Sequence, residues 1–315
     1  MAGGIGSRFW PMSTQKYPKQ FQDILGTGRT MIQQTYDRIS QIVPQENIYV
    51  ITNKEYVELT EQQLPELNSE NIVGEPMMKN TAACNLYMAK KIADKNPEAN
   101  MIVLPADHLI LKETVFLQKI ELAFELASKN DYLITLGIKP TRPDTGYGYI
   151  QFVEKKNSEY FKVKTFTEKP DLEIAKTFLE SGDFLWNAGI FVWNVKSILS
   201  AFEDFLPEMS QNFESCEYNT KAEAQCIDLI YPKVSKISID NGILEKAKNV
   251  HVIPADLGWS DLGTWNSIYE NADKDHEENA SKSKYLLSYN SKGNLIKMKK
   301  NKALVIDGLE NYIIV

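Results

Sequence analysis

The chain has 315 residues, of which 35 are basic and 42 acidic, so its formal net charge is −7 and its pI is about 5.3. A nucleic-acid-binding protein would normally carry a basic domain, and this charge balance argues against a nucleic-acid partner. No apolar run approaches the ~18 residues of a membrane-spanning helix, and the start lacks the basic and apolar regions of a signal peptide. No membrane contact is therefore expected.

The cysteines suggest where the protein works. Cys84, Cys216 and Cys226 are an odd, scattered set that does not form a disulfide framework and has no metal-ligand spacing. The three histidines leave little material for a histidine metal site. A protein of the reducing cytoplasm is therefore expected.

The first 138 residues alternate short apolar runs with helical patterns, which is typical of β-α-β units around a parallel sheet. Helices are predicted at 30–39, 54–64, 80–95 and 116–127, and strands at 47–51, 71–74, 101–104 and 132–138. Asn80 is a suitable N-cap for the third helix. Residues 101–104 are continuously apolar, as expected of a strand buried on both faces, and Asp107 follows the carboxyl end of this strand.

After Pro140 the pattern changes to loops and alternating strands. Strands are predicted at 146–153, 161–166 and 189–193, and helices at 172–180, 195–205 and 221–231. The polar stretch 273–284 predicts a linker or mobile loop, which divides the chain into domains 1–282 and 283–315. The second domain has strands predicted at 286–289, 295–299, 303–306 and 312–315, with a hairpin-turn signal at Asp307-Gly308 and no internal repeat in the chain.

A glycine cluster near the start predicts a phosphate-binding loop. Without Cβ atoms, the backbone N–H groups of Gly3, Gly4 and Gly6 can approach a polyphosphate, whose charge Arg8 and Lys19 would neutralise. Two familiar phosphate-binding motifs do not fit this loop. A Walker A loop needs Gly-Lys-Ser/Thr at its end, and a dinucleotide fingerprint needs another glycine where Phe9 stands. The alternative is a glycine-rich turn with incidental basic residues.

The string Gly3-Gly4-x-Gly6-x-Arg8-x-x-Pro11, with Pro18-Lys19-Gln20, resembles the signature of the sugar-phosphate nucleotidylyltransferase family. Further stretches resemble its mannose-1-phosphate guanylyltransferase branch and cover essentially the whole chain in order. They begin at Gly74, Lys79, Pro105, Phe166, Trp186, Ser238 and Gly258. The resemblance implies an α/β fold: a Rossmann-like, doubly wound mixed sheet of the nucleotide-diphospho-sugar transferase type, with a small C-terminal β module. It implies transfer of GMP from GTP to mannose 1-phosphate.

The resemblance also implies the site residues. Asp107 and Asp261 would hold the catalytic Mg²⁺ or Mn²⁺, and two carboxylates suffice because Mg²⁺ keeps waters and takes substrate phosphates as further ligands. Arg8, Lys19 and Asp107 would be catalytic. The nucleotide would be bound by Gly3, Gly4, Gly6, Ser7, Arg8, Lys19, Glu75, Asn80 and Thr81, and the sugar phosphate by Gly146, Glu168, Lys169, Asn187, Gly189 and Asp240.

Several of these residues have a structural alternative. Glu75 could accept hydrogen bonds from N1–H and the amino group of guanine, or it could be a solvent residue before a turn. Asn80 could be only a helix cap. Glu168 and Lys169 could form a surface ion pair, and Asp240 could cap a helix at 243–247.

The expected chemistry needs no general base. A sugar 1-phosphate has a second pKa near ~6, so its oxygen is already an ionised nucleophile at neutral pH. We expect in-line attack on the α-phosphorus of GTP, with Mg²⁺ bridging phosphates and with Arg8 and Lys19 stabilising the pyrophosphate leaving group. The alternatives are another pair of nucleotide and sugar 1-phosphate, or an inactive paralogue that senses nucleotide sugars.

Three expectations concern the extent of the chain and its assembly. Only 33 residues follow residue 282, too few for an appended phosphomannose isomerase module. A phosphate loop should follow a buried strand, so a strand is expected to precede Met1, and the final β-hairpins are expected to continue past Val315. The oligomeric state stays open, with a homodimer as one candidate.

Overall fold

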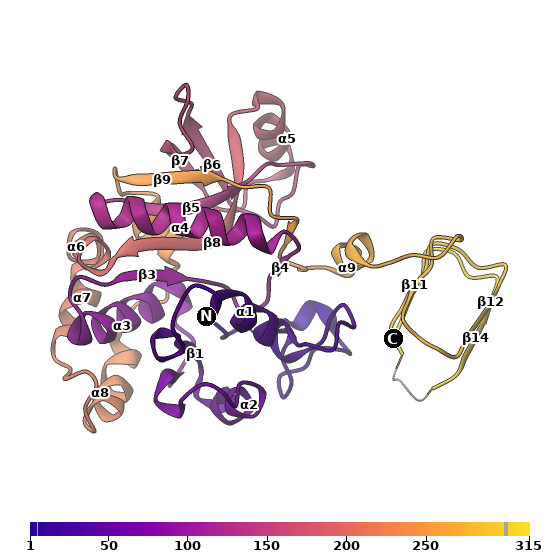
Figure 1. The fold of residues 1–315 in the computed structure, drawn as a ribbon, viewed down its shortest axis with the longest axis horizontal. Helices are drawn as coiled ribbons and strands as arrows, with labels where there is room; N and C mark the ends of the chain where they lie inside the picture. The colour runs from indigo at the N-terminus through magenta and orange to yellow at the C-terminus, as the bar shows by residue number, and fades with distance from the viewer. Residues whose placement is uncertain (5, 299–301) are drawn as a thin grey trace. The chain divides into compact units, whose positions relative to one another are not determined.

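The computed structural model describes residues 1–4, 6–298 and 302–315 (Figure 1). The chain folds into two compact units, each built from separate segments. Unit 1 contains Met1–Gly3, Arg38–Pro105 and Ile110–Trp259. Unit 2 contains Gly4–Asp37, Ala106–Leu109 and Ser260–Val315. The boundary predicted at residue 282 lies inside unit 2, and a separate domain after that residue stays a prediction.

The main sheet of unit 1 has six strands in the order β3-β8-β5-β9-β7-β6. These strands are β3 Asn100–Val103, β8 Phe184–Asn194, β5 Leu133–Ile138, β9 Val250–Pro254, β7 Phe161–Thr167 and β6 Tyr149–Val153. Within it, only β5 and β9 pair in parallel. The long strand β8 separates β3 from β5 and runs antiparallel to both, so the predicted mixed sheet is confirmed. A parallel reading of the first half alone is wrong, because β8 comes from the second half of the chain.

Helices cover both faces of the central strands, so β5, β8 and β9 are mostly buried, whereas β7 keeps exposed lysines on one side. In Figure 1 the helix α4 lies along β5 and β8, which it contacts through an apolar stripe that includes the buried residues Phe116, Ile120, Ala123 and Ala127. A second apolar core on the other face includes residues of α3, α6 and α7. The helices of unit 1 are α2 Val57–Gln63, α3 Asn80–Lys95, α4 Glu113–Lys129, α5 Leu172–Ser181, α6 Val195–Phe205, α7 Pro207–Glu214 and α8 Glu223–Ile230.

A smaller parallel pair in unit 1 joins β1 Val50–Asn53 to β2 Ile72–Glu75. The first residues of the chain run beside it. The N–H of Ala2 donates to the carbonyl oxygen of Ile51 at 2.8 Å, and the amino group of Met1 donates to that of Leu104 at 2.8 Å. The predicted strands at 47–51 and 71–74 are therefore confirmed, each displaced toward its carboxyl end.

Unit 2 has a core of its own, made from residues that are far apart in the sequence. Phe9, Met31, Leu109 and Leu262 are buried together with Leu295. The helix α9 Trp265–Asn271 packs on this core through Ile268. Its other helix, α1 Met31–Ile39, begins in unit 2 and ends in unit 1. The short strands β4 Leu109–Ile110 and β10 Trp259–Ser260 also span the two units in sequence.

The last strands of unit 2 form a parallel coil. The strands β11 Ala280–Ser281, β13 Leu295–Ile296 and β15 Ile313–Ile314 make one sheet, and β12 Leu286–Tyr289 and β14 Leu304–Asp307 make another. Leu286 pairs with Leu304, and Leu295 with Ile313, so the same spacing recurs. The predicted hairpins are wrong because Gly308, with φ +69°, turns the chain from one sheet into the other.

The polar stretch 273–284 is not a mobile linker. The Oδ1 atom of Asp275 accepts the N–H groups of Glu277 (3.0 Å) and Asn279 (2.8 Å). The side chain of Asn279 is buried and donates to the carbonyl oxygen of Ser291 at 2.9 Å. Buried polar side chains, and not apolar ones, hold this turn, which is why the composition of the stretch suggested a linker.

The cysteine prediction is wrong for two of the three residues. Cys216 and Cys226 form a disulfide, with Cα atoms 5.6 Å apart, whereas Cys84 is a buried free thiol. Cys226 belongs to α8 and Cys216 follows α7, a helix that the sequence analysis missed. The turn between the two helices brings the cysteines together. The separation of 10 positions between Cys216 and Cys226 does not by itself indicate such a turn.

Removing this disulfide should lower the free energy of unfolding. The bridge closes a loop over a sequence separation of 10, which corresponds to roughly 2 to 3 kcal/mol of denatured-state entropy. The Cys216→Ser/Cys226→Ser variant should therefore unfold at a lower urea concentration than the oxidised protein. Dithiothreitol should shift the parent protein to the same midpoint and leave the variant unchanged. Equal midpoints for the oxidised protein and the variant would contradict the bridge.

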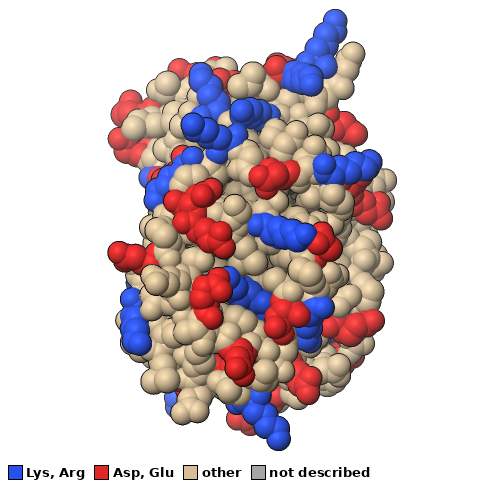
Figure 2. All heavy atoms as spheres, turned by 90° about the vertical axis from the view of Figure 1, so that its left-hand side faces the viewer, with Lys and Arg blue, Asp and Glu red and all other residues tan. Residues whose placement is uncertain are grey.

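The surface is mixed in charge on the face drawn in Figure 2, where basic and acidic side chains are interspersed and no continuous basic area forms. Among the described residues, none of the helices has the length and apolar character required to cross a membrane.

Candidate active site

Three predicted residues from distant parts of the sequence meet in unit 2. Lys19 begins the short helix η2 Lys19–Phe21, and its side chain is only 5% exposed. The Nζ atom of Lys19 lies 3.0 Å from Oδ2 of Asp107 and also donates to the backbone carbonyl oxygen of Asp261. The fold therefore brings a lysine and the two predicted metal ligands together.

Asp107 is held in its ionised form. Burial favours the neutral acid, but the positive charges of Lys19 and His108 and the hydrogen bond from Lys19 outweigh burial, so the pKa of Asp107 lies below its usual value. The side chain of Asp107 nevertheless keeps 36% of its surface exposed. A carboxylate that is charged and reachable from solvent is suited to receive a cation.

The donor set of this group fits Mg²⁺. Asp107 and Asp261 both offer carboxylate oxygens, and Oδ1 of Asp261 accepts the N–H of Gly263 at 2.8 Å, which orients the carboxylate. In the described parts of the chain, no cluster of three or more metal-ligating side chains occurs. Mg²⁺ needs only one or two protein carboxylates when substrate phosphates and water complete its shell. The pair therefore suits a metal that arrives with phosphates.

The glycine loop lies against the same lysine. Gly6 has φ +64°, and a Cβ atom there would lie 2.7 Å from Cβ of Lys19 and 3.2 Å from Oγ of Ser13. The position therefore requires glycine for both its conformation and its contacts. Nothing lies within 4 Å of the Cβ position of Gly4, so the loop is open to a ligand there. Ile5 lies outside the described residues.

The cationic residue that follows the loop is exposed. Arg8 belongs to the short helix η1 Ser7–Phe9, whose last residue, Phe9, is buried. The Nζ atom of Lys19 lies 5.8 Å from the centre of the Phe9 ring. Arg8 thus lies outside the core while Lys19 is part of it. The side chain of Ser7 lies outside what the structure describes, so its predicted role stays a prediction.

Glu75 ends β2 in unit 1 and is not a solvent residue. It is 8% exposed, and its Oε1 accepts a hydrogen bond from the hydroxyl of Tyr231 at 2.9 Å. Burial raises the pKa of Glu75 to about 7, and the bond from Tyr231 opposes this rise. The Oε2 atom lies 4.0 Å from the Cβ position of Gly3, so this carboxylate faces the first glycine of the loop.

The start of α3 differs from the predicted cap. Asn80 is the first residue of the helix, with φ +66°, and its Oδ1 accepts the N–H of Thr81 at 2.9 Å, so Asn80 is not the N-cap. Asparagine tolerates this left-handed conformation better than most residues do. Thr81 has a structural partner, because its Oγ1 accepts the N–H of Ile239 at 2.8 Å. Thr81 thus ties α3 to the segment that leads to Asp240.

Two predicted sugar-site residues are in contact. The Nδ2 atom of Asn187 donates to Oδ1 of Asp240 at 2.9 Å, and the Oδ1 atom of Asn187 accepts the N–H of Gly189 at 3.0 Å. Gly189 has φ +67°, which allows this turn within β8. Asp240 begins the π-helical turn Asp240–Leu244 and is not an N-cap, because its side chain bonds Asn187. The predicted helix at 243–247 is replaced by that turn.

The carboxylate of Glu168 also acts on Asp240 through its negative charge. Burial, together with the negative charge of Glu168, raises the pKa of Asp240 to about 6. Glu168 forms the ion pair with Lys169 that was the structural alternative. Asn187, Glu168 and Asp240 therefore make a polar group in unit 1, suited to accept hydrogen bonds from hydroxyl groups.

Two residues of this part of the molecule were missed. A Cβ atom at Gly148 would lie 2.9 Å from Oε2 of Glu168, whereas Gly146 instead donates its N–H to Asp144 at 2.8 Å. Gly148 is therefore the glycine that permits the close approach to Glu168. Tyr231, the partner of Glu75, was also missed, because a lone tyrosine in a predicted helix carries no signal of its buried hydrogen bond.

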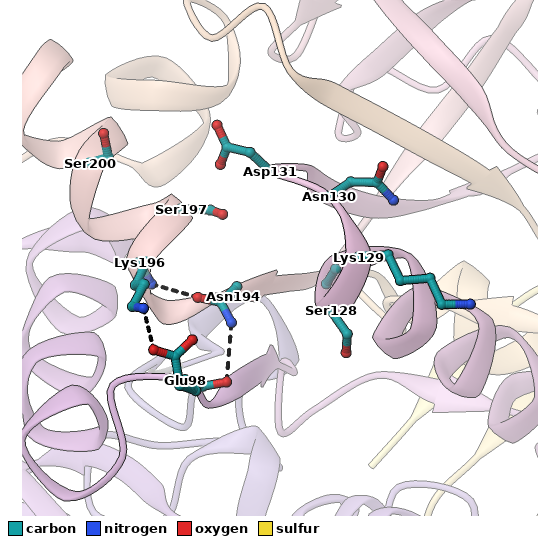
Figure 3. A pocket seen from close by; sticks show the side chains of 10 residues that line it. Glu98, Ser128, Lys129, Asn130, Asp131, Asn194, Lys196, Ser197 and Ser200 are labelled. Carbon is teal, nitrogen blue, oxygen red and sulfur yellow. Dashed lines mark hydrogen bonds and ion pairs between the residues drawn. The ribbon is translucent and has the colours of Figure 1, made fainter.

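A surface pocket lies elsewhere in unit 1. Figure 3 shows side chains at the start of α6 facing those that follow α4, with Asp131 and Asn130 across from Ser197. Two of its charged residues, Lys196 and Glu98, form an ion pair with each other. None of the predicted site residues lines this pocket.

Comparisons with known proteins show the family of the chain. Residues 1–278 match the family model described as "Nucleotidyl transferase". The chain is 35% identical over 327 residues to a mannose-1-phosphate guanylyltransferase of Salmonella muenchen, covering 100% of this chain and 67% of that protein. It is 37% identical over 291 residues to a mannose-1-phosphate guanylyltransferase of Klebsiella pneumoniae, covering 89% of this chain and 60% of that protein. The chain thus spans about two thirds or less of the length of these relatives.

Solved structures give the same picture. A structure titled as a "mannose-1-phosphate geranyltransferase" from Thermus thermophilus superposes with a TM-score of 0.87 at 26% identity, covering 99% of this chain and 90% of that one. A structure titled "mannose-6-phosphate isomerase from Helicobacter pylori" has a TM-score of 0.66 at 25% identity, covering 78% and 95%. The family match over most of the sequence is decisive, and the chain belongs to the nucleotidyl transferase family.

Proposed function

We propose that the protein transfers GMP from GTP to mannose 1-phosphate and forms GDP-mannose and pyrophosphate. The observation that carries the proposal is the group of Lys19, Asp107 and Asp261, which offers a buried cation and two carboxylates beside a glycine loop. The mannose-1-phosphate guanylyltransferases that it resembles at 35% and 37% identity supply the substrates of the proposal.

The proposed reaction is an in-line displacement at the α-phosphorus of GTP. A phosphate oxygen of mannose 1-phosphate forms the new bond to phosphorus, and the bond from phosphorus to the β-bridging oxygen breaks, with its electrons leaving on pyrophosphate. Because a sugar phosphate has its second pKa near ~6, its attacking oxygen is ionised at neutral pH and needs no base. Positioning and charge neutralisation then supply the catalysis.

Unit 2 supplies the groups for the phosphates. Asp107 and Asp261 would hold Mg²⁺ or Mn²⁺, which supplies positive charge to the phosphates when it is bound. Arg8 is exposed and can reach a ligand, while Lys19 is fixed by Asp107. The backbone N–H groups of the glycine loop add further donors to phosphate oxygens.

Unit 1 supplies the groups for recognition. Glu75 accepts from the N1–H and amino group of guanine, which adenine and uracil do not offer in that arrangement. Asn80 and Thr81 bind the nucleotide beside it. Hexose hydroxyls are bound by Glu168, Asn187 and Asp240, with Lys169 toward the sugar phosphate and with Gly146 and Gly189 allowing close approach.

Location and assembly are part of the same proposal. The substrates are nucleotides and sugar phosphates, which favours work in the cytoplasm without a nucleic-acid or membrane partner. The Cys216–Cys226 disulfide is of a kind that is rare in reducing compartments, so it counts against this location. A homodimer is proposed as the assembly.

The proposal is tested by measuring pyrophosphate release. GTP, ATP and UTP are each paired with mannose 1-phosphate and glucose 1-phosphate, with and without Mg²⁺. GTP with mannose 1-phosphate should give the highest kcat/KM, and chelation of the metal should abolish release. Faster turnover of UTP or ATP would reject the guanylyltransferase assignment, and no turnover of any pair would favour a nucleotide-sugar sensor.

A further inference from the structure

A buried tyrosine is bonded to the carboxylate assigned to the base. Tyr231 is fully buried in the short helix η6 Tyr231–Lys233, directly after α8, and its hydroxyl donates to Oε1 of Glu75 at 2.9 Å. Burial and the negative charge of Glu75 keep the pKa of Tyr231 above its usual value, so this hydroxyl stays a donor at neutral pH.

The ring of Tyr231 is fixed by other aromatic side chains. It packs edge-to-face against Tyr87 and Phe213, with ring centres 6.4 Å and 5.9 Å away. Tyr87 is itself held by a 2.6 Å hydrogen bond to the buried carboxylate of Glu223. A ring packed on two sides cannot follow a moving partner, so Tyr231 determines where Oε1 of Glu75 lies.

The two oxygens of Glu75 therefore have different surroundings. Oε1 is bonded to Tyr231, whereas Oε2 lies 4.0 Å from the Cβ position of Gly3. Of the two, Oε2 is the oxygen on the side of Gly3, a residue proposed to bind the nucleotide. Guanine offers two neighbouring N–H donors, which one carboxylate oxygen can accept through its two lone pairs.

We propose that Tyr231 is a positioning residue for base recognition, which anchors Oε1 of Glu75 so that Oε2 accepts from the N1–H and amino group of guanine. This inference rests on the proposed function of Glu75. It assigns to Tyr231 no contact with substrate, only the placement of the group that makes the contact.

The hydrogen bond also affects the charge of Glu75. Burial raises the pKa of Glu75 to about 7, whereas the bond from Tyr231 and the amino group of Met1 lower it. The other titratable groups near this carboxylate are the hydroxyl of Tyr87 and the thiol of Cys84, and burial raises the pKa of both. Loss of the Tyr231 hydroxyl therefore shifts Glu75 toward its protonated form, which carries a donor where guanine needs an acceptor.

The test compares Tyr231→Phe with Tyr218→Phe. Tyr218 belongs to the same aromatic cluster and donates a 2.7 Å hydrogen bond to the carbonyl oxygen of Phe213, but it does not bond Glu75. Both variants lose one buried hydroxyl bond, so their stabilities should fall by similar amounts. Only Tyr231→Phe should raise the Kd and KM for GTP, by about tenfold, with kcat and the KM for mannose 1-phosphate within about twofold.

The pH dependence provides a second readout. The Kd for GTP, measured by calorimetry from pH 6 to 9, should rise in the parent protein as pH falls through about 7, where Glu75 takes up a proton. In Tyr231→Phe this rise should begin at higher pH, because the lost bond had lowered the pKa of Glu75. In Tyr218→Phe the profile should match that of the parent. Because the phosphates of GTP titrate equally in all three proteins, comparing the profiles cancels their effect on the Kd.

Two outcomes would overturn the inference. One is an equal effect of both variants on GTP affinity, and the other is a tenfold loss from Tyr231→Phe that persists in a Glu75→Gln background, where no ionised carboxylate is left to position. If the parent protein prefers UTP or ATP, the proposed function fails. Tyr231→Phe and Tyr218→Phe are then measured with the preferred nucleotide, and equal affinities of the two variants for it would reject the positioning role as well.

Discussion

The Asp107→Asn variant should lose about 10³-fold in kcat for pyrophosphate formation, which corresponds to about 4 kcal/mol of activation free energy. Asparagine keeps the volume of the side chain and can still accept the hydrogen bond that Lys19 donates at 3.0 Å, so the fold should survive. The substitution removes the negative charge that would hold Mg²⁺. Binding of GTP should partly persist, because the contacts proposed for its base lie at Glu75.

The measurement is a magnesium titration of kcat, together with the Kd for GTP from calorimetry. The matched control is Asp256→Asn, whose side chain is 82% exposed and pairs with Lys112 at the surface. That control should keep kcat within about twofold. Full activity in Asp107→Asn would remove Asp107 from the metal site.

Replacing Lys19 with methionine should lower kcat/KM by about 10²-fold and also destabilise the fold. Methionine fills the space of a side chain that is only 5% exposed but supplies no charge to a developing pyrophosphate. It leaves Asp107 without its ion pair and the carbonyl oxygen of Asp261 without this donor. Breaking a buried pair costs about 3 to 5 kcal/mol, and since Asp107 is 36% exposed we expect roughly 2 kcal/mol.

Activity is measured well below the unfolding midpoint, and stability is measured by urea denaturation. Lys16→Met is the control, because Lys16 is an exposed lysine three positions earlier in the same loop. Neither quantity should change in that control. If Lys19→Met lowers only the free energy of unfolding and retains kcat/KM, the role of Lys19 is purely structural.

Elements with strong periodicity were predictable from the sequence. The helix at 80–95 was predicted with both of its ends, and the apolar stripe from Phe116 to Ala127 lies buried against the sheet. The position of Asp107 after a continuously apolar run predicted a ligand site there, because ligands of α/β sheets bind beyond strand ends, and this role stays a prediction. Such features depend on neighbours in the sequence, and the sequence shows them directly.

Features that depend on distant partners were not predictable. The antiparallel strand β8 between β3 and β5, and the bond from Tyr231 to Glu75, each join residues far apart in the chain. The pairing of Cys216 with Cys226 depended on the unpredicted helix α7. The resemblance to a family supplied the candidate site residues, but it pointed to Gly146 and not to Gly148, because only the packing of Glu168 shows which glycine lies next to that carboxylate.

The discontinuous composition of unit 2 has a consequence for biosynthesis. Its core joins Phe9 to Leu109 and to Leu262 and Leu295, so the segment around Phe9 completes its packing only after residues beyond 260 have left the ribosome. Until then, the core that carries the glycine loop lacks Leu262 and Leu295. Contacts of such long sequence separation form slowly, and the loop should stay sensitive to proteases on stalled nascent chains that lack residues beyond 260. The packing that fixes the glycine loop should therefore appear only after residues beyond 260 have been translated.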